Sequence, residues 1–88
     1  MKILFETSFA KDLKNINDSK VFSKVKDLIA EVKQADNLAD INNVKKLHGS
    51  KDYFRIRLGN YRIGFELSED TIIFVRILHR KDIYKRFP

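Results

Sequence analysis

Residues 53 to 65 encode a two-stranded hairpin, reading Tyr53-Phe54-Arg55-Ile56-Arg57-Leu58-Gly59-Asn60-Tyr61-Arg62-Ile63-Gly64-Phe65. Apolar and basic residues alternate on both sides of Gly59-Asn60, and such a dipeptide is typical of a two-residue turn. This turn pairs Arg57 with Arg62, and paired residues share a face of the sheet. Arg55 lies two residues along on the same face. We therefore expect three arginines side by side, with the apolar residues on the opposite face.

Three neighbouring guanidinium groups repel one another unless they bind an anion, so this face is a candidate phosphate site. The charge distribution agrees, because the whole net charge of +6 lies in residues 45–88, where eleven basic residues face five acidic ones. Residues 1–44 carry seven of each. This separation favours a polyanionic partner, either a nucleic acid or an acidic protein. The plain alternative is a basic surface that serves only solubility.

Length and composition indicate one domain spanning residues 1–88, held together by its apolar core. The chain has no cysteine, which excludes disulfides and thiolate metal sites and fits a reducing cytoplasm. Apolar residues make up 43% of the sequence, including seven Phe and three Tyr. Neither a signal peptide nor a run of about 18 apolar residues is present, so we expect a cytoplasmic protein.

The hydrophobic pattern predicts an α+β fold, in which two N-terminal helices pack on one face of a small, mostly antiparallel sheet. Thr7-Ser8 and Asn17-Asp18-Ser19 are the expected helix caps. The run from Ile72 to Leu78 is apolar on nearly both faces and is expected to be a central strand. The predicted strands are 2–6, 53–58, 61–67 and 71–79, the helices 9–17 and 20–35, with a loop at 36–43, a short extended or turn segment at 44–49 and a helical turn within 80–88.

The usual catalytic constellations are absent from the sequence, and we expect neither a metal nor another cofactor. His48 and His79 lack carboxylates at ligand spacing, and there is no glycine-rich phosphate loop. What remains is a set of cations with hydroxyl and imidazole groups. Such a set can cleave RNA, since the adjacent 2′-hydroxyl is the nucleophile and arginines stabilise the charge of the transition state.

Each candidate also has a structural interpretation. Arg55 and Arg57 can be the solvent side of an ordinary strand. Arg76 lies in an apolar run, and we expect it to be structural, either extending its charged end to solvent or pairing with Glu66. His48 is expected in a loop and His79 in a hydrogen bond, while the ring of Tyr84 can dock on the sheet. The residues alone thus indicate a basic sheet face that binds a phosphate backbone or an acidic peptide.

The sequence resembles the RelE branch of the RelE/ParE toxin superfamily, whose members are toxins of bacterial and archaeal toxin–antitoxin pairs. The resemblance covers the whole chain, and its most specific parts are the hairpin and the closing run. The matching segments are Val44-Lys45-Lys46-Leu47-His48-Gly49, the hairpin from Tyr53 to Phe65, and Ile77-Leu78-His79-Arg80-Lys81-Asp82-Ile83-Tyr84. The resemblance implies a RelE-like fold and a metal-independent endoribonuclease that cleaves mRNA in the ribosomal A site and so inhibits translation.

The family's catalytic positions carry over onto five residues of this chain. Arg55 and Arg57 match the basic pair that contacts the scissile phosphate region, where the best-known enzyme has lysines. Arg62 matches the arginine that stabilises the transition state, and Arg80 the arginine near the leaving group. Tyr84 matches the tyrosine that stacks on or orients the substrate nucleotide. Because arginine rarely gives up its proton, proton transfer is expected to shift to His79 or Tyr84.

The remaining expectations concern partners. His79 and Lys81 are expected to bind substrate, and the ribosome with its mRNA is the expected target. A cognate antitoxin with an acidic segment is expected to neutralise the toxin, and any DNA binding would occur only through the toxin–antitoxin complex. The alternative is a non-catalytic toxin of the ParE branch, which inhibits DNA gyrase. The five retained catalytic positions favour the ribonuclease.

Overall fold

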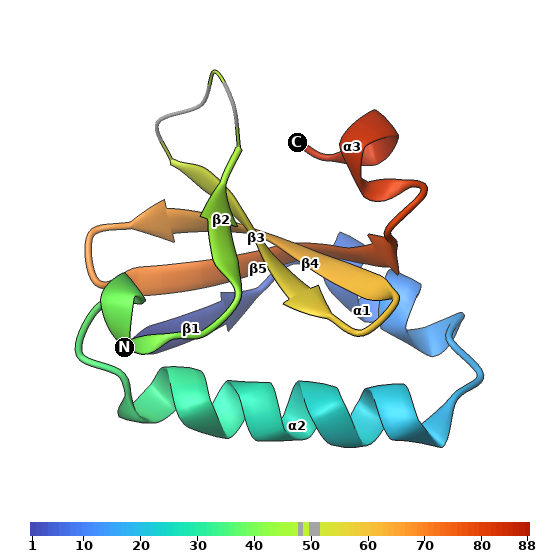
Figure 1. The fold of residues 1–88 in the computed structure, drawn as a ribbon, viewed down its shortest axis with the longest axis horizontal. Helices are drawn as coiled ribbons and strands as arrows, with labels where there is room; N and C mark the ends of the chain where they lie inside the picture. Colours follow the sequence, from blue (N-terminus) through green and yellow to red (C-terminus); the bar gives the residue numbers. More distant parts are fainter. Residues whose placement is uncertain (48, 50–51) are drawn as a thin grey trace.

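The computed structural model describes residues 1–47, 49 and 52–88 of the chain. Within them, five strands form one sheet in the order β1-β5-β4-β3-β2, with every neighbouring pair antiparallel except β1 and β5 (Figure 1). The predicted α+β class and the mostly antiparallel sheet are therefore confirmed. The strands are β1 (Lys2–Phe5), β2 (Val44–Lys46), β3 (Tyr53–Leu58), β4 (Tyr61–Ser68) and β5 (Thr71–His79), and the helices are α1 (Thr7–Lys14), α2 (Ser19–Gln34) and α3 (Ile83–Arg86), with a 3₁₀ turn at Leu38–Asp40.

The two N-terminal helices begin in different ways. Asp18 caps α2, because its side chain accepts a hydrogen bond from the Lys20 amide at 2.9 Å, as the sequence predicts. The expected cap of α1 at Thr7-Ser8 is wrong, since Glu6 occupies the cap position and makes no side-chain cap bond. The Ser8 hydroxyl instead donates to the Val75 carbonyl at 2.6 Å, which ties α1 to β5.

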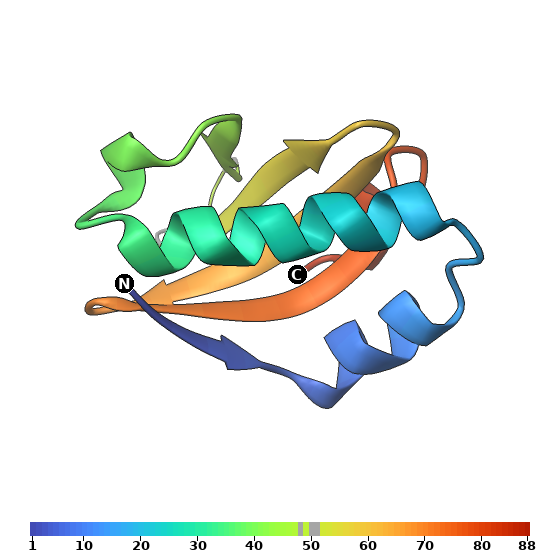
Figure 2. The same ribbon diagram turned by 90° about the horizontal axis from the view of Figure 1, so that it is seen from below.

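The main core lies between these helices and one face of the sheet. Figure 2 shows α2 crossing this face, with α1 beside it. Phe9 from α1 packs on Phe74 of β5, with ring centroids 5.4 Å apart. The buried residues of this core are Phe9, Ile16, Val21, Val25, Leu28, Val32, Ala35, Ile41, Ile56, Ile63, Phe65, Ile72, Phe74 and Ile77. Two helices thus share one sheet face, as predicted.

A second, smaller cluster covers part of the opposite face, where α3 packs on the sheet. It consists of Leu47, Leu78, Ile83 and Phe87. The predicted helical turn of the tail is confirmed, and α3 lies on the other side of the sheet from α2 (Figure 1). β5 is apolar on both faces because both clusters draw residues from it. It is an interior strand, but β4 takes the middle position because β1 adds beyond β5.

The expected pairing of Arg76 with Glu66 is wrong. The Asp12 carboxylate of α1 accepts hydrogen bonds from Arg76 Nε at 2.6 Å, from Arg76 Nη2 at 2.9 Å and from the Ile77 amide at 3.1 Å. Glu66 lies opposite Ile73 in the sheet. Arg76 is nonetheless structural, as expected, because this bidentate pair fastens α1 to β5.

In the described part of the chain, no helix is long and apolar enough to cross a membrane. The segment 44–49 was expected to be extended or a turn, and its first three residues form the edge strand β2. His48, which we assigned to a loop, lies outside the described residues.

Candidate active site

The hairpin has the register that its turn predicts. Leu58 pairs with Tyr61, Arg57 with Arg62 and Ile56 with Ile63. Gly59 adopts φ = +63°, a left-handed conformation that glycine accepts without strain. Arg55, Arg57 and Arg62 consequently share one face, and Phe54, Ile56, Leu58, Tyr61 and Ile63 pack in or against the main core on the other.

The arginine face is electrostatically crowded around Arg62. Burial lowers the pKa of the Arg62 guanidinium, and the nearby cations of Arg55 and Arg57 lower it further. Its Nη1 donates to the carbonyls of Gly59 at 2.8 Å and Tyr61 at 2.9 Å, which holds the side chain over the turn. The folded protein therefore disfavours this charge, as expected of a site prepared for an anion.

The chain end brings two more predicted residues to the same face. The Arg80 amide donates to the Asn60 carbonyl at 2.8 Å, which ties the start of the tail to the hairpin turn. Both Tyr84 and Arg80 act on the pKa of Arg62, the phenol raising it and the guanidinium lowering it. Tyr84 is 62% exposed, so its ring is open to a ligand.

His79 does not join this group. His79 pairs across the strands with Tyr61, whose ring lies 5.7 Å away and packs against the main core. His79 thus faces away from Arg62, beside α1. Its Nδ1 accepts a 3.3 Å hydrogen bond from the Lys81 amide, and the Lys81 side chain is exposed. The structure gives no support to proton transfer by His79 at the arginine face.

Two residues that the sequence does not single out also belong to the arginine face. Lys45 of β2 pairs with Arg55 and so points the same way. The Asn43 side chain accepts a 3.5 Å hydrogen bond from Arg57 Nη2. Asn43 has φ = +66°, a conformation that asparagine tolerates better than most residues. The only sequence signal for these two residues was the extended run that follows Asn43. That run does not show which residue of β3 each of its residues pairs with, so it could not place Lys45 beside Arg55.

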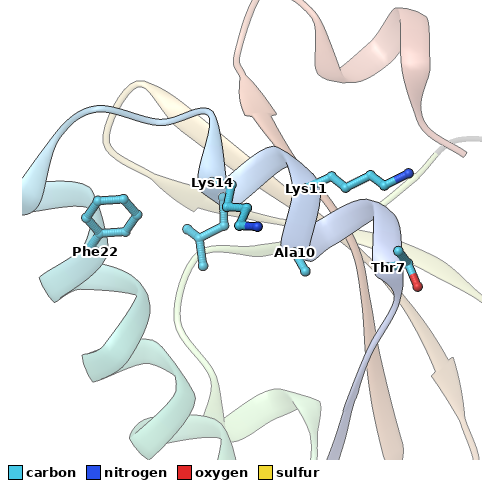
Figure 3. Close-up of a pocket in the computed structure, with 6 residues that line it drawn as sticks. Thr7, Ala10, Lys11, Lys14 and Phe22 are labelled. Carbon is cyan, nitrogen blue, oxygen red and sulfur yellow. The ribbon is translucent and has the colours of Figure 1, made fainter.

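A larger, apolar hollow lies away from the arginines, between α1 and α2 (Figure 3). Its volume is about 700 Å³, and Phe22 of α2 lies across from Lys14 and Ala10 of α1. The lining of this hollow is mostly apolar, so it suits binding of an apolar group.

Both the sequence and the fold of this chain match those of known toxins. The chain matches the sequence model of the ParE toxin of type II toxin–antitoxin systems over residues 3–84. It is 47% identical to Toxin RelE3 of Methanocaldococcus jannaschii, with all of both chains covered. It is 33% identical to the Putative toxin RelE1 of the same organism, covering 82% of this chain and 80% of the relative. The chain belongs to the ParE/RelE toxin family.

A solved structure gives the same assignment. The RelB–RelE antitoxin–toxin complex from Methanococcus jannaschii contains a chain that superposes with a TM-score of 0.82 at 45% identity, covering 97% of this chain and 99% of that one. The protein is accordingly a RelE-type toxin, as the resemblance implies.

Proposed function

We propose that this toxin is a ribosome-dependent endoribonuclease that cleaves mRNA in the ribosomal A site and thereby inhibits translation. The observation that carries this proposal is the gathering of Arg55, Arg57 and Arg62 on one face, with Arg80 and Tyr84 beside them. Membership of the RelE-type toxins supports it. Such an activity would take place in the cytoplasm, where messages are translated.

The proposed reaction is attack of a 2′-hydroxyl on the adjacent phosphate, with departure of the 5′-oxygen. Arg57 and Arg62 would bind the phosphate oxygens, and Arg62, held over the turn, would stabilise the extra negative charge of the transition state. Arg80, tied to the turn through Asn60, would lie near the leaving oxygen. No metal takes part in this scheme, because the substrate supplies the nucleophile and the arginines supply the positive charge.

Proton transfer is the step for which arginine is least suited, since its guanidinium stays protonated. With His79 on the other face, Tyr84 and solvent are the proton carriers at the arginine face. Tyr84 also presents an exposed ring, and base–aromatic stacking contributes about 1–3 kcal/mol. We expect its ring to place the nucleotide that contains the attacking hydroxyl.

The test is cleavage on ribosomes programmed with a defined message, with the 5′ and 3′ ends mapped. Cuts confined to the A-site codon, and absent from the same RNA without ribosomes, are expected. An intact message under these conditions would contradict the proposal.

The alternative is inhibition of DNA gyrase, and the observation in its favour is that the matching family model is described as a ParE toxin. A gyrase-directed toxin has no need of a phosphate-binding arginine cluster, so we rank it second. Gyrase-dependent DNA breaks in the presence of the purified protein, with translation unaffected, would reverse this order.

We also propose that a RelB-like antitoxin with an acidic segment neutralises the toxin. The toxin in the Methanococcus jannaschii structure is bound to RelB, and it is 45% identical to this chain. An acidic segment over the arginines would make association fast and strongly dependent on salt. Association rates measured across a salt series are the test. Rates that do not change with salt would mean that the antitoxin binds the apolar surface and leaves the arginines exposed.

A further inference from the structure

Lys45 and Arg55 form a pair of cations at the edge of the arginine face. They lie directly opposite each other in the antiparallel ladder between β2 and β3, so both side chains project from the same face. β2 is the edge strand, and Lys45 is exposed. Along β3 this pair lies two residues farther from the turn than the Arg57–Arg62 pair.

The surface on each side of Arg55 is hollowed, and Lys45 borders both hollows. One hollow, of about 290 Å³, is lined by Asn43, Val44, Lys45, Arg55 and Arg57. The other, of about 260 Å³, is lined by Lys45, Lys46, Leu47, Arg55 and Tyr84. A ligand that reaches Arg55 from either side therefore passes Lys45, and on one side it also meets the ring of Tyr84.

The charges of this pair are uncompensated. Within the described residues, neither Lys45 nor Arg55 forms an ion pair, whereas Arg76 is fully engaged with Asp12. The Arg55 Nε–H group is buried and has no hydrogen-bond acceptor among those residues. A buried donor without a partner is unfavourable, and an anion bound between the two side chains would satisfy it.

The spacing along β3 relates this pair to the proposed cleavage site. Arg55 and Arg57 are two residues apart on one strand, roughly 6.6 Å at the usual rise per residue. That separation is comparable with the step between neighbouring phosphates of a single RNA strand. If the scissile phosphate binds at Arg57 and Arg62, the next phosphate of the message falls at Lys45 and Arg55.

We propose that Lys45 and Arg55 clamp a non-scissile phosphate of the RNA, next to the phosphate that is cut. Lys45 is then a substrate-positioning residue that acts through binding. The proposal rests on the proposed function, because the ligand it names is the message in the A site.

The test uses ribosomes programmed with messages whose cleavage-site 2′-hydroxyl is methylated, so that binding is measured without cutting. Single phosphates around the site are replaced, one message at a time, by uncharged methylphosphonates. For the wild-type toxin, replacing the phosphate at the clamp should weaken binding about tenfold, the effect of a typical charged hydrogen bond. Lys45→Met, which keeps the aliphatic stem, should weaken binding to the natural message to a similar extent. The same single replacement should weaken binding of the Lys45→Met variant less than it weakens binding of the wild type, because Lys45 no longer contributes and only Arg55 still contacts that phosphate.

Two variants serve as controls. Lys33→Ala removes one charge from the exposed side of α2, behind the sheet, and should leave both affinity and the methylphosphonate pattern unchanged. Lys45→Arg keeps the charge and should restore most of the affinity. The salt dependence of binding should become shallower for Lys45→Met only, by about the amount of one phosphate contact.

The outcomes separate the clamp from the nuclease. If the position-specific effect appears but a message with an ordinary 2′-hydroxyl is not cut, the clamp stands and the nuclease fails. Two results would overturn the clamp while the nuclease stands, provided that the message with an ordinary 2′-hydroxyl is cut. One is that Lys45→Met binds the natural message as tightly as Lys33→Ala does. The other is that replacing any phosphate around the site weakens binding equally. A toxin that does not bind programmed ribosomes at all overturns both.

Discussion

The ring of Phe87 occupies the space in which a side chain on Gly64 would stand. A β-carbon on residue 64 would lie 2.5 Å from Cδ2 of that ring, closer than non-bonded atoms approach. Gly64 sits in the middle strand β4, and Phe87 follows directly after α3. The absence of a side chain at residue 64 thus lets the end of the chain dock on the sheet and carries Tyr84 to the arginine face.

This relationship predicts that Gly64→Ala is destabilising and also impairs activity. The added methyl group must displace the Phe87 ring, and overpacking of this kind typically costs about 1–3 kcal/mol. Urea unfolding should show the loss, and cleavage should slow because α3 no longer presents Tyr84 correctly. In a Phe87→Ala background the methyl group has room, so adding Gly64→Ala should change the stability little further. Additive losses in the double variant would contradict the packing argument.

A second prediction concerns the bidentate pair between Asp12 and Arg76. Asp12→Asn should lower the free energy of unfolding by about 2–3 kcal/mol, because it leaves a largely buried guanidinium without its counter-charge. The hydrogen bonds with Asp12 raise the pKa of Arg76, so its contribution to stability is present at neutral pH and is lost only as the pH rises through that raised pKa.

The control for this pair is the double variant Asp12→Asn, Arg76→Met. The double variant should lose less stability than the sum of the two single variants, because it leaves no charged side chain without its partner. Unfolding in urea, followed by circular dichroism, measures all three variants. Cleavage at temperatures well below the unfolding transition should be unaffected, because the pair lies apart from the arginine face.

The hairpin and its arginine face could be predicted from sequence because the information is local. A two-residue turn fixes which residues pair, and the alternation of side chains then fixes the faces. The same logic explains why His79 could not accompany Arg80. His79 ends β5 opposite Tyr61, so its side chain shares the core face with that ring, whereas Arg80 lies in the turn that follows the strand.

The features that could not be predicted depend on contacts between distant parts of the chain. Asp12 and Glu66 are chemically equivalent partners for Arg76, and only the packing of α1 on β5, 64 residues away in sequence, selects Asp12. The place of Lys45 on the arginine face could not be predicted for the same reason. Its strand has three residues, and their sequence does not show which residues of β3 they pair with. The register between β4 and β5 also shifts at Gly64 and Phe65, so the pairing on one side of this irregularity does not predict the pairing on the other side.

A third prediction tests the charge at the centre of the site. Arg62→Ala should slow single-turnover cleavage on programmed ribosomes by about 10²-fold or more, as expected for loss of a group that stabilises transition-state charge. The lowered pKa of Arg62 means that folding disfavours its cation at every pH below that pKa, so stability should stay unchanged or rise slightly. Arg86→Ala removes the same charge from a side chain that lines a groove beside Asp12 and His79, and should cleave at nearly the wild-type rate. An unimpaired Arg62→Ala would remove this residue from the proposed site.

The last prediction separates stacking from proton transfer at Tyr84. Its ring is exposed beside the arginines, and stacking needs the ring but not the hydroxyl. We therefore expect Tyr84→Phe to retain most of the activity and Tyr84→Ala to lose about 10- to 100-fold, the equivalent of about 1–3 kcal/mol of stacking. His79→Ala is the matched control, and because His79 faces away from Arg62 it should cleave like the wild type. Single-turnover rates of the three variants on the same programmed ribosomes decide the point. If Tyr84→Phe is as slow as Tyr84→Ala, the phenol itself moves a proton or holds the phosphate, and the stacking role is wrong.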